Sequence, residues 1–245
     1  MIPLLYDAEL SPAGKRVRMA LWLGDVRYQR VRIDLGLLDQ KSEAYLALNP
    51  TGVVPTYRDG AATVYDSHLI LEYLAEQGLL VLPDVSSGRV AIAARKWMVV
   101  ERELARLMRP AVYETVGRKR LRQRFSSWDE ALAALSRRTA NRGYLNSLQA
   151  VFEQPENTAL IETTRLQLEP LFAAAERILD GQPWLAGSVM GMADLAMGSR
   201  LAVCSRLELL DQERYPGLAA YLGRLQDEPC WSGADDQPWH EDFLN

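Results

Sequence analysis

The sequence predicts a mixed α/β domain at residues 1–82, followed by an all-helical domain at residues 89–245. Two observations lead to this fold class. Before residue 83, short strand-like runs alternate with helical patterns, an order that builds a small sheet with helices on its faces. After residue 88, apolar residues recur at helical spacing with few breakers. The segment 83–88, which contains Pro83 and Ser-Ser-Gly, is the expected linker.

Local signals predict the first three elements. A strand is expected at residues 2–6, and a second strand with alternating polarity at residues 27–33. Between them, a helix is expected at residues 12–23. Pro12 suits the first helical position, and Ser11 before it is a good N-cap.

A hairpin comes next, because Thr56–Arg58 and Ala62–Tyr65 flank the turn sequence Asp59-Gly60. Pro55 has no N–H to donate, so it belongs at the start of its strand. Its bond with Val54 is a candidate for the cis form that prolines adopt in tight turns. The N–H and C=O of Val54 would then face outward, where a short extended peptide could pair with them.

Asp66 or Ser67 caps the helix that follows the hairpin. Free N–H groups at a helix start, together with the helix dipole, favour a carboxylate. Taken alone, Ser67 is explained by helix capping without any ligand, and Pro55 is explained by its place at the start of a strand. Their close spacing favours a site for a short peptide that carries a carboxylate. The apolar positions of this helix are Leu69, Ile70, Tyr73 and Leu74.

Two long helical patterns mark the second domain. Arg89–Tyr113 is one run with few breakers, and a later run ends at Gly181 with Pro183 beyond it. The apolar positions of the later run are Leu160, Leu168, Leu171, Phe172, Ala175 and Leu179.

Composition excludes several classes of protein. The chain has 245 residues and a formal net charge of −4, which argues against a nucleic-acid-binding protein. No apolar run is long enough to span a bilayer. The first residues lack a basic region and a cleavage site, so we expect no signal peptide. Cys204 and Cys230 are not spaced as a metal or redox motif. We therefore expect a reduced, cytoplasmic protein.

Three motifs carry a resemblance to a known family: Asn49-Pro-Thr-Gly-Val-Val-Pro55, Asp59-Gly60, and Asp66-Ser67 at a helix start. Together they resemble the thioredoxin-like domain of cytosolic glutathione transferases, of the serine type found in bacteria. The resemblance covers residues 1–82 and 160–225 well and the middle poorly. It implies a thioredoxin-like N-terminal domain, an all-α C-terminal domain, glutathione as co-substrate, no metal, and a homodimer. Leu4–Asp7, Leu10–Leu21 and Trp184–Ala196 agree with the same family.

In this family, the position of Ser11 holds the catalytic group that meets the sulfur of glutathione. A free thiol titrates at about pH 8.5, so little of it is thiolate at neutral pH. A hydroxyl donor at a helix N-terminus favours the anion, and lowering the thiol pKa by about two units requires ~2.7 kcal/mol. A serine that only caps the helix is the alternative. Tyr6, at the end of the first strand, is the other candidate for the thiol partner.

The resemblance assigns the remaining glutathione contacts residue by residue. Lys41 is expected near the glycine carboxylate, although a solvated surface lysine explains it equally well. Val54 and Pro55 are expected to meet the peptide backbone. Asp66 and Ser67 are expected to anchor the γ-glutamyl end, and Asp66 is shorter than the Glu that is commoner there, which gives Ser67 more weight.

Two positions depart from the family. His68 is not a family feature, and we expect a surface or dimer-face histidine. Gly191 stands where relatives carry Ser or Thr three residues before Asp194, so only half of a capping box is expected. Glycine caps nearly as well as threonine, so the helix should survive.

The electrophile pocket is expected along the helical run after the linker, with Met108 and Tyr113 as lining candidates and Tyr6 opposite them. The apolar positions of this run also include Trp97, Val100 and Leu104. Most such positions are more typical of a buried core than of a pocket. The basic segment 117–124 is expected to be a solvated helix face or loop, with an anionic substrate or partner as the alternative. Residues 116–157 are longer than the usual connection, as in bacterial relatives that dehalogenate aromatics or cleave aryl ethers.

The sequence therefore predicts a glutathione transferase that activates the glutathione thiol for attack on a small hydrophobic electrophile. Conjugation, dehalogenation and ether cleavage all fit this chemistry. The alternative is a non-catalytic protein of the same fold that binds a partner or has a regulatory role. Neither prediction involves nucleic acid or a membrane.

Overall fold

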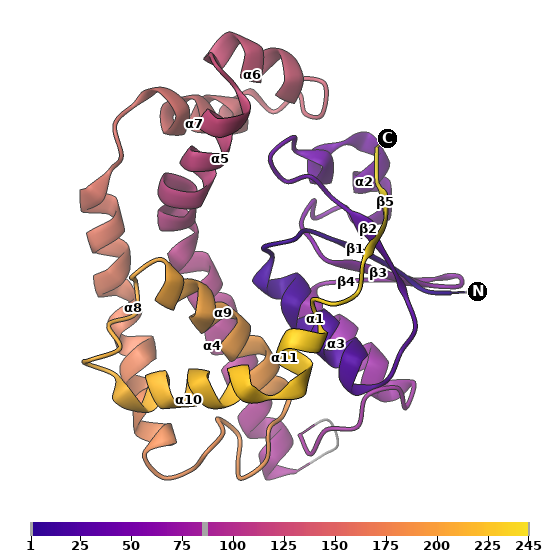
Figure 1. The fold of residues 1–245 in the computed structure, drawn as a ribbon, viewed down its shortest axis with the longest axis vertical. Coiled ribbons are helices and arrows are strands. Elements are labelled where there is room, and N and C mark those ends of the chain that lie inside the picture. The colour runs from indigo at the N-terminus through magenta and orange to yellow at the C-terminus, as the bar shows by residue number, and fades with distance from the viewer. Residues whose placement is uncertain (1, 85–87, 245) are drawn as a thin grey trace.

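A small sheet packs beside a larger group of helices (Figure 1). The structure is a computed structural model that describes residues 2–84 and 88–244. Three residues of the predicted linker, 85–87, lie outside the described residues. The elements before the linker are β1 (Leu4–Asp7), α1 (Pro12–Leu23), β2 (Gln29–Arg32), a 3₁₀ turn (Asp39–Lys41), α2 (Glu43–Leu48), β3 (Thr56–Asp59), β4 (Ala62–Tyr65) and α3 (Ser67–Glu76). The predicted first helix, the hairpin and the helix after it are confirmed.

The sheet has the strand order β4-β3-β1-β2-β5. β1 pairs parallel with β2 and antiparallel with β3, so Leu5 lies opposite both Arg30 and Tyr57. Leu5 and Tyr57 are fully buried, and they pack in one core cluster with the apolar residues of α1 and α3. This packing places the N-termini of α1 and α3 at the same edge of the domain.

The fifth strand, β5 (Trp239–Asp242), was not predicted from the sequence and pairs parallel with β2. The C-terminal segment thus returns from the helical region to the sheet (Figure 1). Its sequence, Trp-His-Glu-Asp, has no run of β-branched residues to predict a strand. Arg30 holds it from β2, since its guanidinium lies 3.8 Å from the centre of the Trp239 ring.

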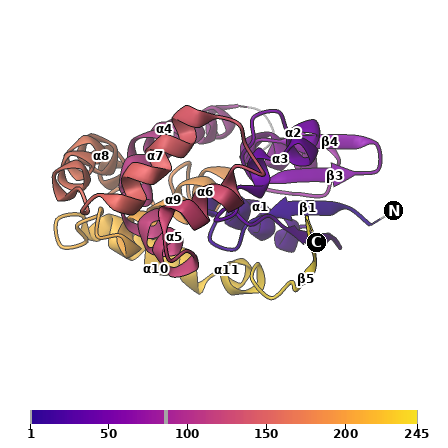
Figure 2. The same cartoon turned by 90° about the horizontal axis from the view of Figure 1, so that it is seen from above.

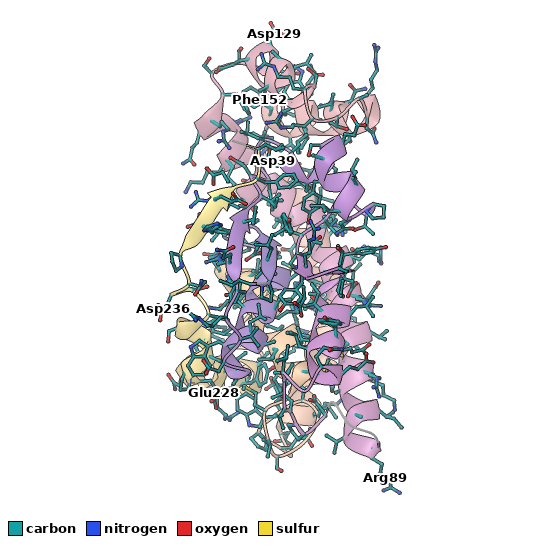
Figure 3. All side chains as sticks on the ribbon, turned by 90° about the vertical axis from the view of Figure 1, so that its right-hand side faces the viewer. Asp39, Arg89, Asp129, Phe152, Glu228 and Asp236 are labelled. Carbon is teal, nitrogen blue, oxygen red and sulfur yellow. The ribbon has the colours of Figure 1, made fainter. Side chains whose placement is uncertain are left out.

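The elements after the linker are helices, apart from β5. α4 begins with Arg89 at one end of the molecule, and the α6–α7 hairpin, marked by Asp129 and Phe152, lies at the other end (Figure 3). No helix among residues 2–84 and 88–244 combines the length and apolar character needed to cross a membrane. The helices are α4 (Arg89–Val112), a π-helical turn (Tyr113–Gly117), α5 (Arg118–Arg124), α6 (Trp128–Leu135), α7 (Arg142–Glu153), α8 (Thr158–Leu179), α9 (Met192–Arg206), α10 (Pro216–Asp227) and α11 (Pro229–Gly233).

The start of α9 explains the glycine at position 191. Asp194 Oδ2 accepts from the Gly191 N–H at 2.8 Å, which is the predicted half of the capping box. Asp84, from the linker, caps the helix in place of an N-cap side chain, since its carboxylate accepts from the N–H groups of Met192 and Ala193 at 2.9 and 3.3 Å. A Cβ on residue 191 would lie 2.2 Å from Asp84 Oδ2, so this close approach requires glycine.

The basic segment is a solvated helix face only in part, since Lys119, Arg122 and Arg124 are exposed whereas other residues of it make buried contacts. Arg118 is buried, pairs with Glu114 and donates to the carbonyl oxygens of Val151 and Gln154. Arg124 pairs with Asp34 at 2.7 Å. These contacts fasten α5 to α7 and to the loop after β2. The apolar residues Leu38, Leu121, Phe125, Trp128, Ala131, Leu135, Leu145, Leu148 and Val151 form one core cluster. Figure 2 shows α6 and α7 projecting over α5 and α9.

Candidate active site

A cavity of about 780 Å³ lies between the sheet domain and α4, α5 and α7. This volume is typical of a pocket for a small ligand. Seven of the predicted site residues line it: Ser11, Lys41, Val54, Asp66, Ser67, Met108 and Tyr113. The fold thus brings residues from six elements or loops around one space.

Ser11 is the N-cap of α1 and faces the cavity. Its Oγ accepts from the Gly14 N–H at 3.0 Å, which uses one lone pair and leaves the hydroxyl hydrogen available. No group in the described parts of the chain accepts that hydrogen. Pro12 has no N–H, and Ala13, which also lines the cavity, is in the first turn, where N–H groups lack helical acceptors. A hydroxyl donor and the positive end of α1 therefore point at one place, as an anion site requires.

A second helix N-terminus lies at the same cavity. Asp66 is the N-cap of α3, and its Oδ1 accepts from the His68 N–H at 2.9 Å. Between the two alternatives open in the sequence, Asp66 therefore caps and Ser67 is the first helical residue. The Ser67 side chain is nearly buried and lines the cavity. Arg102 of α4 lies 3.3 Å from Asp66 Oδ1, so the α3 N-terminus presents an acceptor and a cation side by side.

Lys41 and Val54 lie on the opposite rim. The ammonium of Lys41 donates to the Gly52 carbonyl oxygen at 2.6 Å, and the lysine is half-buried rather than fully solvated. Burial lowers the pKa of Lys41, and the charge of Arg109 lowers it further. The Val54–Pro55 bond is cis. Val54 lines the cavity, whereas Pro55 is buried and does not.

Tyr6 is not brought to the cavity, in contrast to its place in the sequence analysis. It is buried in a separate cluster beneath the sheet. Its ring packs edge-on against Tyr45 at 6.5 Å and against Phe243 at 5.7 Å, measured between ring centres. Tyr6 therefore fills the core between β1 and the C-terminal segment.

A buried ionic cluster beneath the cavity was missed. Glu101 of α4 binds Arg16 of α1 and, at 2.7 Å, Arg200 of α9. His68 Nε2 lies 3.1 Å from the other oxygen of Glu101. His68 is 3 % exposed, so the expected surface histidine is wrong. The only signal for this cluster in the sequence was Glu101, a charged residue amid an apolar helical pattern. Its partners are distant in the chain and could not be identified from it.

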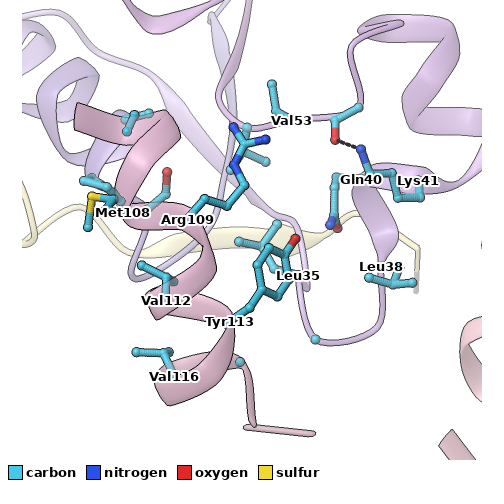
Figure 4. Close-up of a pocket in the computed structure, with 18 of the residues that line it drawn as sticks. Leu35, Leu38, Gln40, Lys41, Val53, Met108, Arg109, Val112, Tyr113 and Val116 are labelled. Carbon is cyan, nitrogen blue, oxygen red and sulfur yellow. Dashed lines mark hydrogen bonds between the residues drawn. The ribbon is translucent and has the colours of Figure 1, made fainter. Parts of the chain in front are cut away.

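The far half of the cavity is apolar and aromatic. Met108, Val112 and Val116 of α4 and the π-helical turn face Leu35 and Leu38 across it (Figure 4). Tyr113 also projects into this half, and its hydroxyl lies 3.1 Å from that of Tyr144 on α7. π-helical turns often occur at functional sites. Trp97 and Leu104 belong to the helical core instead.

Comparisons with known proteins show what the chain is similar to. The family model described as the glutathione S-transferase N-terminal domain matches residues 5–78. The chain is 24% identical over 238 residues to glutathione S-transferase hmp2 of Hypomyces subiculosus, covering 94% of this chain and 96% of that protein. It is 25% identical over 199 residues to glutathione S-transferase F10 of Arabidopsis thaliana, covering 80% and 78%.

Solved structures share the whole fold. The β-etherase LigF from Sphingobium sp. strain SYK-6 superposes with a TM-score of 0.81 at 18% identity, covering 97% of this chain and 100% of that one. The likeness extends over the sheet, both helix N-termini and the helical region. Residues 5–78 therefore match the N-terminal domain of glutathione S-transferases, and over its length the chain is similar to proteins of that family in sequence and in fold.

Proposed function

We propose that the chain is an active glutathione transferase in which Ser11 stabilises the thiolate of glutathione. The observation that carries this proposal is the unused Ser11 hydroxyl hydrogen at the N-terminus of α1, directed at a cavity shared with the N-terminus of α3. Two positive helix ends on one cavity suit a ligand with a thiolate at one point and a carboxylate at another.

The proposed pose uses residues already placed around the cavity. The γ-glutamyl carboxylate takes the Ser67 hydroxyl and N–H at the start of α3, and the Asp66 carboxylate takes the ammonium. The backbone of Val54 pairs with the cysteinyl residue. Lys41 binds the glycine carboxylate as a point charge. This pose directs the cysteinyl sulfur toward Ser11.

The proposed reaction is a nucleophilic substitution or addition by the thiolate. The thiol loses its proton, and the Ser11 hydroxyl donates a hydrogen bond to the resulting anion. A carbon–sulfur bond then forms at the electrophilic carbon. In a substitution, the bond from that carbon to a halide or aryl oxide breaks, and the leaving group departs with the electron pair. The apolar residues around Met108 and Tyr113 bind the electrophile next to the sulfur.

Glutathione binding measured by isothermal titration calorimetry tests the proposal, with Ser67→Ala beside the unaltered protein. We expect binding that Ser67→Ala weakens by about tenfold, the effect of one charge-assisted hydrogen bond. Thr115→Ala is the control, because the Thr115 hydroxyl binds the Ala111 carbonyl oxygen within its own helix. An absence of binding at millimolar glutathione would favour the non-catalytic, partner-binding alternative.

Homodimerisation and a cytoplasmic location belong to the same proposal, since both follow from the family resemblance. Size-exclusion chromatography with light scattering measures the first. An elution mass equal to one 27.6 kDa chain would exclude a stable dimer.

A further inference from the structure

The cavity carries an excess of positive charge. Six cationic side chains line it against two carboxylates, those of Asp66 and Glu101. Glutathione has two carboxylates and one ammonium, so its single net charge does not balance this excess. The six cations are Arg16, Lys41, Arg102, Arg109, Arg120 and Arg200.

Four of these cations already have a partner or a proposed one. Arg16 and Arg200 bind Glu101, which is buried beneath the cavity. Arg102 pairs with Asp66. Lys41 holds the Gly52 carbonyl oxygen and faces the proposed glycine carboxylate.

Arg109 and Arg120 have no such partner. Neither forms a hydrogen bond through its side chain, or an ion pair, with any residue of 2–84 or 88–244. Arg109 is exposed and Arg120 is half-buried. Carboxylates near this wall are committed elsewhere: Glu114 to Arg118, Asp34 to Arg124 and Asp39 to Arg138. Arg120 is the only charged residue of the basic segment 117–124 that lines the cavity.

Arg109 faces another cation across the cavity. Figure 4 shows its side chain projecting from α4 toward the side that carries Gln40 and Lys41. The Arg109 charge contributes to the lowered pKa of Lys41, after the larger effect of burial. Like charges that face each other repel. An anion between them would turn this repulsion into two attractions.

Arg109, Tyr113, Val116 and Arg120 recur at the spacing of one helix face, and all four line the cavity. At 1.5 Å per residue, the two arginines are separated by about 16 Å of helix. The lining between them is apolar and aromatic, with Tyr113 and Tyr144 joined through their hydroxyls. A slot of this kind suits an elongated aromatic body, and a guanidinium at each end suits an acidic group on it.

We infer that the co-substrate is an aromatic electrophile that carries an anionic group such as a carboxylate, and that Arg109 or Arg120 binds this group, depending on the end of the slot that it reaches. The inference rests on the proposed function, because it assigns the second substrate of the same site. A carboxylate on the aromatic body takes charge-assisted hydrogen bonds from a guanidinium. The body itself packs against Met108, Val112 and Leu148.

Matched pairs of glutathione conjugates test the inference. S-(4-carboxybenzyl)glutathione is compared with its carboxamide, and a longer pair carries the same groups on the far ring of a biphenylmethyl substituent. The glutathione part is constant, so each ratio of dissociation constants reports on the far half of the cavity. We expect the carboxylate to bind about tenfold more tightly than the carboxamide in at least one pair, equal to about 1.4 kcal/mol.

Variants assign this preference to the two arginines. Arg109→Gln or Arg120→Gln should abolish it in the pair whose length reaches that residue, while the affinity for the carboxamides changes little. Lys119→Gln should keep the preference, because Lys119 is the exposed neighbour of Arg120 and does not line the cavity.

Three results would overturn the inference while the proposed function stands. One is equal binding of carboxylate and carboxamide by the unaltered protein. Another is a preference that survives when Arg109→Gln and Arg120→Gln are combined in one variant. The third is an Arg109→Gln variant that weakens unmodified glutathione as much as the carboxylated conjugates, which would place Arg109 in the glutathione site. Failure of glutathione and both carboxamides to bind would instead remove the proposed function itself.

Discussion

Glu101 of α4 and Arg16 of α1 form a buried ion pair beneath the cavity, and this pair ties the helical wall to the helix that carries Ser11. Arg200 of α9 binds the same oxygen of Glu101. His68 of α3 lies against the other oxygen. One carboxylate therefore joins four helices from both halves of the chain, and the relative position of the two cavity walls depends on it.

Replacing Glu101 with Gln removes the counter-ion of two guanidinium groups. Breaking a buried ion pair on one side costs about 3–5 kcal/mol, so we expect the free energy of unfolding from urea titration to fall by this amount. Glu103→Gln is the matched control on the same helix, since the side chains of Glu103 and its partner Arg106 are 44 and 66 % exposed. Equal loss of stability in the two variants would contradict the role assigned to Glu101.

The same contact makes stability depend on pH. Burial raises the pKa of Glu101, but Arg16 and Arg200 outweigh it and hold that pKa well below its ordinary value. The stabilisation is therefore present above the ordinary value of about 4.5 and is lost as the pH falls below it, because the unfolded chain takes up the proton first. The stability difference between the unaltered protein and Glu101→Gln should shrink in that range.

Replacing Ser11 with Ala should lower turnover much more than glutathione affinity. The lost hydrogen bond to the thiolate is worth about 1.5–3 kcal/mol, which corresponds to a roughly 10- to 150-fold fall in kcat. The pKa of bound glutathione, followed through the ultraviolet absorbance of the thiolate, should rise in the variant. The turnover measurement uses a general electrophile such as an activated aryl halide, and the pKa is measured without it.

Ser42→Ala controls for the loss of a helix cap. Ser42 is also a buried N-cap serine, whose Oγ accepts from the Tyr45 N–H at 3.3 Å, but it does not line the cavity. We expect both variants to lose about 1 kcal/mol of stability and only Ser11→Ala to lose turnover. Unchanged turnover in Ser11→Ala would remove this hydroxyl from the mechanism.

Local signals predicted the parts of the site that short segments build. Ser11-Pro12 and Asp66-Ser67 each place a cap and a helix start within two residues, and the structure contains both helices. Asp59-Gly60 predicted the hairpin, and its pairing is present. Such features depend on backbone preferences of adjacent residues, which one sequence displays directly.

Contacts between distant segments could not be predicted in this way. Asp84 caps α9 from a position 108 residues earlier in the chain. His68 is buried only because α4 brings Glu101 over it. β5 forms because it can pair with the edge of β2 and because the Arg30 guanidinium packs on the Trp239 ring. In each case, the deciding partner is supplied by tertiary packing rather than by the local pattern.

At the start of α9, the Asp84 carboxylate caps the helix in place of a side chain at position 191. A double-mutant cycle at these two positions tests this substitution. Asp84→Ala should destabilise the protein by about 0.5–2 kcal/mol, the typical cost of losing an N-cap side chain. Gly191→Ser should destabilise the unaltered protein, because its Cβ would lie 2.2 Å from Asp84 Oδ2. In the Asp84→Ala background, the serine has room and can accept from the Asp194 N–H as in a full capping box.

Urea unfolding of the two single variants and the double variant measures this coupling. We expect the double variant to be more stable than Gly191→Ser alone, with an interaction energy of about 1–3 kcal/mol. Equal destabilisation by Gly191→Ser in both backgrounds would show that Asp84 and residue 191 do not compete for the same space.

His68 should remain neutral at pH values where a free histidine is half protonated. Burial lowers its pKa; Glu101 opposes this effect, and Arg16 adds to it. Guanidinium nitrogens of Arg16 and Arg102 lie 2.6 and 3.1 Å from the two ring nitrogens, so positive charge flanks the imidazole on both sides. Because the folded pKa lies below the ordinary 6.5, the resulting stability is present above that pH and is lost as the pH falls below it.

Proton NMR of the imidazole signals against pH measures this pKa, and the chain has two histidines. His240→Gln assigns the spectrum by removing the exposed one. We expect a His68 midpoint below 6.5. In Glu101→Gln the midpoint should fall further, because the variant removes the carboxylate that favours the imidazolium while Arg16 remains. A midpoint above 6.5, or an upward shift in the variant, would show that burial and the charge of Arg16 do not control the charge of His68.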